Sequence, residues 1–387
     1  MTLDLDDNRM TPAIKALLEN GLKDIGNCIK MLINQAMLVE REHYLGAKNY
    51  ERADSRTGYA NGFKKKVLKS RLGALELSVP QLRDREFYPS FLERGIRSER
   101  ALKVSLAEMY VQGVSTRKVS AILEEMCGLE VSSSQVSRAS QLLDSGLEKW
   151  RHRPLGQFDY LILDARYEKV RRDGTVTDSA VLLAYGIDTQ GKRHVLGTSV
   201  SLSEAGVHWR KFLESLVTRG LHGVKFIVSD AHAGLKEARQ AVFPSVLWQR
   251  CQFHLQQNAQ AYVSKKSMRK EVAEDIRTIF NAPNKEEANR FLKSTILKYE
   301  SSLPKLSEWI EVNIQEGLNV FQLPKAHRVC LRTSNMAERV NREIKRRTQI
   351  VNVFPSVESC ERLISAVIVE IDEDWSQRQR YLLPAEE

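Results

Sequence analysis

The 387-residue sequence lacks the features of several specialised protein classes. It has no run of about 18 apolar residues, the length that a helix needs to cross a bilayer. Its acidic beginning, MTLDLDDNRM, has no apolar segment behind a positive charge, so we expect no secretory signal. It also contains no tandem repeat or low-complexity tract. These absences predict a soluble cytoplasmic protein that does not contact a membrane.

Cysteine is scarce, and the pattern argues against a disulfide framework. The five cysteines are odd in number and widely scattered: Cys28, Cys127, Cys251, Cys330 and Cys360. Cys251 and His254, in QRCQFH, have the spacing of zinc ligands, but a structural zinc needs four ligands and no second pair lies nearby. We therefore expect His254 to form hydrogen bonds, in the core or beside an active site.

Two common catalytic motifs are also missing. The sequence has no G-x-x-x-x-G-K-[ST] segment, so we expect no nucleotide cofactor. It has no G-x-S-x-G nucleophile elbow either. What the chain does have is positive charge, with a net charge of +10 and a pI near 9.3. Such a balance favours a phosphate-bearing partner, nucleic acid or an anionic membrane, although a merely basic surface is an alternative.

The first third of the chain is predicted to bind DNA. Apolar spacing predicts a helix over 12–45, with a stripe of Ile14, Leu17, Leu18, Leu22, Ile25 and Ile29. A hairpin follows, with Gly73 at its turn and Pro80 at its end. Its first strand carries Lys64 and Lys66, which fit either a solvated face or a contact with phosphates.

Residues 98–149 predict three successive helices with short turns. Ser115 is the expected N-cap of the second helix, and Val136, Ala139, Leu142 and Leu143 the inner face of the third. The pattern suits a helix-turn-helix, because a short helix and a turn precede a third helix that begins with polar residues. Such a motif would present Gln135 and Arg138 to DNA. Many packs of three helices share this pattern.

From residue 158 the pattern changes to a mixed α/β sheet. FDYLILDARYEKV, SAVLLAYGID and RHVLGTSVS predict three consecutive strands, and VKFIVSDA and SVLWQR predict two more between helices. Residues 252–316 are helical and charged, which indicates an inserted helical subdomain. We predict five segments: 1–92, 93–153 with the helix-turn-helix, 154–262 and 329–387 as the two parts of the core, and 263–328 as the insertion.

Two aspartates follow apolar runs, Asp164 after YLIL and Asp230 after FIVS. Residues at the carboxyl ends of strands meet at the ligand crevice of an open α/β sheet. Two carboxylates there repel each other unless a cation lies between them, and paired divalent metals would suit phosphoryl transfer. The alternative is that each aspartate only begins a turn or caps a helix.

The segment TSNMAERVNREIKRRT carries a third carboxylate, Glu338. A capping box with Asn335 would explain it, and so would salt bridges along the helix. Met336, Val340 and Ile344 form the expected buried stripe, and Glu338 lies with Arg342 and Lys345 on the opposite side. A glutamate on this basic face also suits a third metal ligand beside a DNA track. Trp209 is expected to pack in the core, with stacking on a displaced base as an alternative.

In several motifs that span nearly the whole chain, the sequence resembles the Mutator-type bacterial insertion-sequence transposases. The motifs are EREHYLGA, SRTGYANGF, LDARYEKVR, SDAHAGL, WQRCQFH, the TSNMAERV helix and FPS. One departure is HLQQN, where a basic residue is expected before the asparagine.

The resemblance implies a DDE active site of Asp164, Asp230 and Glu338 in an RNase H-like domain, with Cys251 and His254 as a further family hallmark. It implies two Mg²⁺ or Mn²⁺ ions, a homodimer, and double-stranded DNA partners in the form of terminal inverted repeats and target DNA. Phosphate contacts are expected from Arg332, Asn335, Arg339, Arg342, Lys345 and Arg346. A non-catalytic helix-turn-helix regulator and a nuclease or resolvase that cuts without joining are the alternatives.

Overall fold

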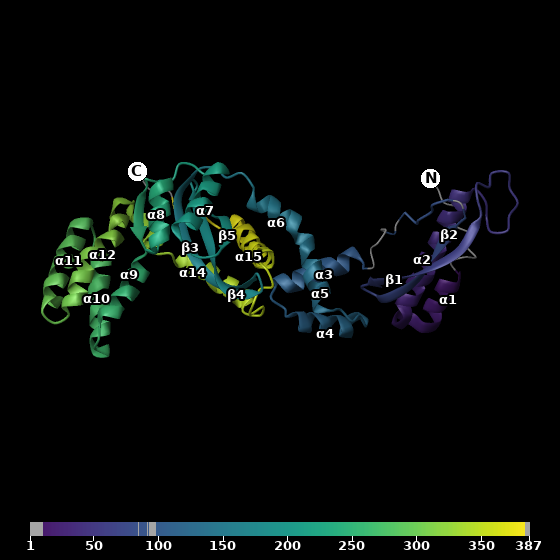
Figure 1. Cartoon of the computed structure of the whole chain (residues 1–387), viewed down its shortest axis with the longest axis horizontal. Coiled ribbons are helices and arrows are strands. Elements are labelled where there is room, and N and C mark those ends of the chain that lie inside the picture. The colour runs from purple at the N-terminus through teal and green to yellow at the C-terminus, as the bar shows by residue number, and fades with distance from the viewer. Residues whose placement is uncertain (1–10, 84, 91, 93–97, 384–387) are drawn as a thin grey trace. The chain divides into compact units, whose positions relative to one another are not determined.

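The computed structural model describes residues 11–83, 85–90, 92 and 98–383. The chain divides into two compact units, 1–142 and 143–387. The second unit is a mixed α/β structure, as the sequence predicts, and the first combines helices with a hairpin (Figure 1). The finer division into five segments stays a prediction. No helix among the described residues combines the length and apolar character that a membrane span requires.

The first unit begins with two helices where the sequence predicts one. α1 (Thr11–Asn20) and α2 (Ile25–Leu45) are separated by a 3₁₀ turn, Gly21–Asp24. Gly21 has a φ of +61°, a left-handed conformation that interrupts a helix and suits glycine. The prediction of one continuous helix over 12–45 is therefore wrong, and most of its apolar stripe does not form a core face. Five of its residues are exposed: Ile14, Leu17, Leu18, Leu22 and Ile25.

The predicted hairpin is present as β1 (Ala60–Ser70) and β2 (Gly73–Leu82), paired antiparallel. Leu75, Leu77 and Val79 are buried and pack with Met37 of α2. Pro80 was expected to end the strand, but β2 continues to Leu82, with Pro80 opposite Phe63 beside an irregularity in β1. A two-stranded ribbon tolerates proline because each strand has a free edge that needs no N–H donor.

Three short helices follow: α3 (Arg100–Val111), α4 (Thr116–Cys127) and α5 (Ser133–Ser140). Ser115 is the N-cap of α4, since its hydroxyl accepts a hydrogen bond from the Lys118 amide at 3.3 Å. The third helix is shorter than predicted, because the chain turns into a 3₁₀ segment at Gln141–Leu143. Val136 and Ala139 are buried as expected, but Leu142 is 49% exposed.

The second unit is built on a five-stranded sheet. Its strands are β3 (Phe158–Arg172), β4 (Thr175–Asp188), β5 (Arg193–Ser201), β6 (Phe226–Ser229) and β7 (Leu247–Arg250). They lie in the order β5-β4-β3-β6-β7. The first three are antiparallel neighbours, and β6 and β7 run parallel to β3. All five strands fall where the sequence predicts them.

Helices cover both faces of this sheet (Figure 1). α7 (Gly206–Thr218) and α8 (Ala233–Val242) enclose an apolar core against residues such as Leu161, Leu163 and Leu182. The opposite face meets α14 (Asn335–Thr348) and α15 (Val357–Gln377), and the Tyr185 and Trp375 rings lie 6.0 Å apart there. α6 (Asp144–Arg151) also packs on α15, where Arg362 forms an ion pair with Asp144 at 2.5 Å.

The predicted helical insertion lies between β7 and α14. It contains α9 (Gln252–Ala259), α10 (Arg269–Phe280), α11 (Lys285–Glu300), α12 (Pro304–Asn313) and α13 (Lys325–Leu331). The α9–α12 helices share an apolar core of their own that includes Ile276, Leu292 and Ile310. Gln249 of β7 ties the insertion to the sheet, since its side chain donates to the Gly317 carbonyl at 2.7 Å and accepts from the Val320 amide at 2.7 Å.

Candidate active site

The register of the sheet brings two predicted aspartates to adjacent positions. On the parallel strands β3 and β6, Ile162 lies opposite Val228. The same offset, carried two residues further, puts Asp230 opposite Asp164 on strands that are typically about 4.8 Å apart. Asp164 does not end its strand as predicted, because β3 runs on to Arg172. It lies instead beside the point where β6 stops, at Ser229.

The glutamate helix α14 is docked on the same stretch of β3. Asn341 Nδ2 donates a hydrogen bond to Asp164 Oδ2 at 2.6 Å, and Arg166 Nη1 donates to the Asn341 carbonyl at 2.5 Å. Two residues further, Glu168 Oε1 accepts from Thr348 at 2.9 Å. Alternate residues of β3 therefore face the helix. Glu338 precedes Asn341 by three residues, which places both on one side of α14.

Cys251 connects the strand that leads to Asp230 with the start of α14. Its amide donates to the Ser229 carbonyl at 2.8 Å. Its buried Sγ accepts two hydrogen bonds from Ser334, one from the amide and one from the hydroxyl, both at 3.3 Å. Ser334 immediately precedes α14 and makes no side-chain cap to the helix. The predicted Asn335–Glu338 capping box is thus wrong, because Asn335 is already the first helical residue.

His254 supplies positive charge beside the aspartates. Its Nδ1 lies 4.0 Å from Asp230 Oδ2. A hydrogen bond with Cys251 raises the pKa of His254 to about 9 against the opposing effect of burial, and the charges of Asp230 and Asp164 act in the same direction. Burial raises the pKa of Asp164 to about 6, although His254 and Asn341 favour its charged form. The pKa of Cys251 is raised by burial but lowered overall by His254 and Ser334.

The carboxylates of Asp164, Asp230 and Glu338 are suitable ligands for a divalent cation, but their side chains do not form a closed coordination site. Carboxylate oxygens are the ligands that Mg²⁺ prefers. Glu338 Oε1 and Asn341 Oδ1 are buried without a hydrogen-bond partner among the described residues, as is His254 Nδ1. Buried polar atoms without partners are uncommon and often mark an absent ligand. Within the described part of the chain, no three His, Cys, Asp or Glu side chains converge closely enough to hold an ion.

A cavity of about 730 Å³ opens on the exposed side of α14. Five of the residues predicted for this site line it: Asn335, Glu338, Arg339, Arg342 and Arg346. Arg193 and Tyr381 form another part of the wall, with the Arg193 guanidinium 4.7 Å from the centre of the Tyr381 ring. Four arginines beside a single unpartnered carboxylate oxygen make a surface suited to phosphate oxygens.

Two other predicted phosphate ligands lie outside this cavity. Arg332 Nη1 donates to Asn281 Oδ1 at 2.8 Å, which turns it toward the helical insertion. Lys345 is exposed on α14 but does not line the cavity. Sequence reasoning missed Arg193, Tyr381 and Asn341. Only Asn341 had a signal, its spacing of three from Glu338.

In the first unit, the predicted DNA contacts are placed as follows. Lys64 is exposed on β1, and Lys66 Nζ donates to the Tyr88 hydroxyl at 2.6 Å. Gln135 closes a capping box with Ser132, since its Oε1 accepts from the Ser132 amide at 2.9 Å. Arg138 is exposed, with Nε 3.3 Å from the Ser134 carbonyl. Arg138 of α5 is thus freer to contact DNA than Gln135.

Trp209 has no exposed surface and packs within the core between α7 and the sheet. Its ring lies 6.1 Å from that of Phe212. The alternative that Trp209 stacks on a displaced base is wrong for this structure, because a stacking partner needs an exposed ring face.

Known transposases match this chain over nearly its whole length. Residues 8–378 match the model of the family described as "Transposase, Mutator family". The chain is 53% identical over 384 residues to the transposase for insertion sequence element IS406 of Burkholderia multivorans, with 99% of each chain covered. It is 42% identical to the ISRM5 transposase of Rhizobium meliloti, with 96% of this chain and 93% of the relative covered.

A third relative, the transposase for IS256 in transposon Tn4001 of Staphylococcus aureus, is 36% identical, with 95% of each chain covered. Among solved structures, a simian T-cell lymphotropic virus intasome complex matches 53% of this chain and 64% of its own at 13% identity. Its TM-score of 0.17 is too low to establish a shared fold. The family match over nearly the whole length is decisive: the chain belongs to the Mutator family of transposases.

Proposed function

We propose that this transposase is a DDE enzyme whose triad is Asp164, Asp230 and Glu338. Two observations carry the proposal: the register of β3 and β6 carries Asp230 toward Asp164, and Asn341, on the helix that bears Glu338, donates a hydrogen bond to Asp164. The strand order, with three antiparallel strands followed by two parallel ones, supports an RNase H-like core. In such a sheet, the ends of the central strands form the reaction site.

We propose further that the three carboxylates hold two divalent ions, Mg²⁺ or Mn²⁺, when DNA is bound. Bound divalent ions would supply charge neutralisation and activation of an attacking oxygen. Asp164 accepts a hydrogen bond from Asn341, which orients it before substrate arrives, and the His254 ring lies 4.0 Å from Asp230. Glu338 completes the set from α14 with an oxygen that has no other described partner.

The reaction then consists of two phosphoryl transfers in sequence. In the first, water attacks the phosphorus at the transposon end; a new P–O bond forms, the bond to the 3′ oxygen breaks, and a 3′-hydroxyl is released. In the second, that hydroxyl attacks a target phosphodiester, which forms one P–O bond and breaks another. Each step loses the proton of its nucleophile and protonates its leaving oxygen. No external energy source is needed, because the number of phosphodiester bonds is conserved in the joining step.

The chain's own residues would position the DNA. Arg339 and Arg342 project from α14 into the cavity that holds Glu338, so phosphates beside the scissile bond would meet them first. Arg346 would be a weaker contact, because it already forms an ion pair with Glu343 at 2.7 Å. In the first unit, the α3–α5 helices would act as a helix-turn-helix for the terminal repeats, with Lys64 of the hairpin contacting the backbone. A protein that acts on bacterial DNA would work in the cytoplasm, at the nucleoid.

The decisive experiment is Asp164→Asn in the full chain. We expect strand cleavage at labelled transposon ends with Mg²⁺ to be lost, and binding of the ends to persist. Asp178→Asn on the exposed part of β4 is the control and should cleave normally. Cleavage that persists in the Asp164 variant would reject the proposed triad. Cleavage without joining of labelled 3′-hydroxyl ends to a target plasmid would indicate a nuclease, and binding without metal-dependent cleavage a regulator.

We also propose that the protein forms a homodimer through α1 and the 3₁₀ turn that follows it. Leu18 and Leu22 are 81% and 77% exposed, and Ile14 lies four residues before Leu18 on the same stripe. An apolar stripe of this kind on a helix is typical of a surface that packs against another copy.

A further inference from the structure

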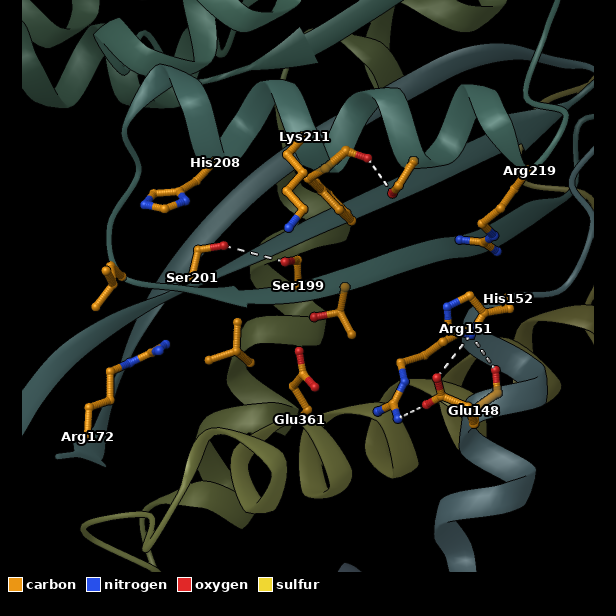
Figure 2. Close-up of a pocket in the computed structure, with 15 residues that line it drawn as sticks. Glu148, Arg151, His152, Arg172, Ser199, Ser201, His208, Lys211, Arg219 and Glu361 are labelled. Carbon is orange, nitrogen blue, oxygen red and sulfur yellow. Dashed lines mark hydrogen bonds and ion pairs between the residues drawn. The ribbon is translucent and has the colours of Figure 1, made fainter.

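A second cavity in residues 143–387 lies beside the edge strand β5. Its volume is about 530 Å³, and its walls come from α6, β5, α7, α15 and the end of β3 (Figure 2). It contains none of the three carboxylates and shares no lining residue with the cavity on α14, although Thr198 of β5 lies only two strands across the sheet from Asp164, roughly 10 Å away. The cavity is therefore separate from the carboxylate site.

Its lining is predominantly cationic. Four permanently charged groups contribute: Arg151, Arg172, Lys211 and Arg219. The opposing carboxylates are Glu148 and Glu361. Glu148 is already neutralised by its ion pair with Arg151. The rest of the lining thus carries three cations against the single charge of Glu361, with hydroxyl groups from β5 between them.

Several donors in this cavity are held in place but unused. Arg172 Nε donates to Ser179 Oγ at 3.2 Å, and Arg219 Nη1 donates to the Leu196 carbonyl at 2.9 Å. The Nη2 atoms of both arginines are buried and have no partner among the described residues, and neither does Thr198 Oγ1. These atoms have almost no accessible surface, so an anion in the cavity would be attracted by the charge of the two guanidinium groups rather than bonded to these atoms.

Lys211 adds an exposed cation to these partly buried ones. It makes no hydrogen bond or ion pair with any residue that the structure describes. Figure 2 shows Lys211 projecting into the cavity from α7 and Glu361 facing it from α15. The guanidinium groups of Arg172 and Arg219 lie on opposite sides. An anion in the cavity would thus be met from several walls.

We propose that this cavity binds a phosphate group of the DNA backbone, as a second DNA contact distinct from the carboxylate site. Guanidinium and ammonium donors that converge on one space match phosphate oxygens. The volume falls in the range of sites that hold a whole small molecule, so it accommodates a backbone phosphate with part of its nucleotide. That the polyanion is DNA rests on the proposed function.

The test compares adjacent cations on α7. Lys211 lines the cavity, whereas Arg210 is directed into an ion pair with Glu214 at 2.9 Å. We expect Lys211→Ala in the full chain to weaken binding of random-sequence duplex DNA and to reduce the slope of log K against log salt by about 0.9. Arg210→Ala should leave the slope unchanged. Glu361→Gln should tighten binding, a gain that misfolding would not produce.

DNA binding is measured without divalent metal. Its result therefore does not depend on whether Asp164→Asn abolishes cleavage. Equal slopes for Lys211→Ala and Arg210→Ala would overturn the proposal. A parallel arm uses inorganic phosphate as the probe, at constant ionic strength. If phosphate raises the melting temperature of the wild type but not of Lys211→Ala, while both DNA slopes are equal, the cavity takes free phosphate and the assignment to DNA fails.

Discussion

Asn341 Nδ2 lies 2.6 Å from Asp164 Oδ2 and donates a hydrogen bond to it, across 177 residues of sequence. The same residue's carbonyl accepts from Arg166 at 2.5 Å. Asn341 thereby fixes both the first aspartate and the helix that carries Glu338. It is a positioning residue, because its effect on the reaction would act through Asp164.

Replacing Asn341 with leucine would remove this link while keeping a similar volume. A hydrogen bond to a charged group contributes about 1.5–3 kcal/mol, so we expect cleavage to slow about 10- to 100-fold. The loss should appear in kcat, with the affinity for DNA unchanged. Gln349→Leu, at the exposed C-terminal end of α14, is the control. A normal kcat for Asn341→Leu would show that Asp164 is oriented by other contacts.

Cys251→Ala should destabilise the second unit, because it leaves the amide and hydroxyl of Ser334 without their acceptor. We expect the free energy of unfolding to fall by about 1–3 kcal/mol more than for Cys360→Ala. Cys360 is equally buried, so the comparison removes the effect of losing a buried thiol. Cys251→Ser, which keeps an acceptor, should recover part of the loss in urea denaturation. Equal losses for Cys251→Ala and Cys360→Ala would contradict the proposed link.

Arg342 and Arg347, on the same helix, should behave in opposite ways. Arg342 is exposed in the cavity, so Arg342→Ala should weaken DNA binding, reduce the salt slope by about 0.9, and change stability by less than about 0.5 kcal/mol. The Arg347 side chain is 5% exposed and is bound to Glu343 and Glu370 at 3.0 and 2.7 Å.

Arg347→Ala should therefore cost about 1–3 kcal/mol of unfolding free energy, less than a fully buried pair because both glutamates are partly exposed. DNA binding at several salt concentrations measures the affinity of both variants, and urea denaturation measures their unfolding free energies. A stable Arg347→Ala protein with impaired DNA binding would mean that the two roles are reversed.

The homodimer proposed above predicts that charge on α1 or on the 3₁₀ turn after it will separate the subunits. Leu18→Glu and Leu22→Glu each bring a carboxylate to the exposed stripe, where burial against a second copy would be unfavourable. We expect a shift from dimer to monomer in sedimentation equilibrium. Leu297→Glu, 69% exposed on α11, is the matched control and should stay dimeric. A wild type that is monomeric at micromolar concentration would exclude this interface.

Glu361 predicts a pH dependence of stability. Burial raises its pKa, as do Glu148 and Glu358, while Arg151 and the Val200 amide oppose the shift. Lys211, Arg172 and Arg219 face the same cavity. The folded state therefore binds this proton more tightly than the unfolded state, and the free energy of unfolding falls as pH rises above the ordinary value of 4.5.

Glu361→Gln cannot ionise, so its stability relative to the wild type should increase between pH 5 and pH 8. Urea denaturation at several pH values measures this difference, in which the other titrating groups largely cancel. A difference that stays constant with pH would show that the Glu361 carboxyl titrates normally.

The sequence by itself determined the identity and order of the elements in the second unit. Alternating and continuous apolar runs placed all five strands, and the spacing of Met336, Val340 and Ile344 identified the buried stripe of α14. Periodicity is informative here because it reports which side of an element leaves water. The long motifs likewise led to the family, which the comparisons confirm.

Only the tertiary structure decided which partner each buried group meets. Adjacent residues Arg346 and Arg347 have the same charge, yet one is exposed and the other is enclosed by Glu370 of another helix. The link between Cys251 and Ser334 spans 83 residues, and the apolar stripe of α1 stays exposed among the residues of its unit that the structure describes. Local pattern specifies that a side chain can be buried, whereas packing between distant segments determines what buries it.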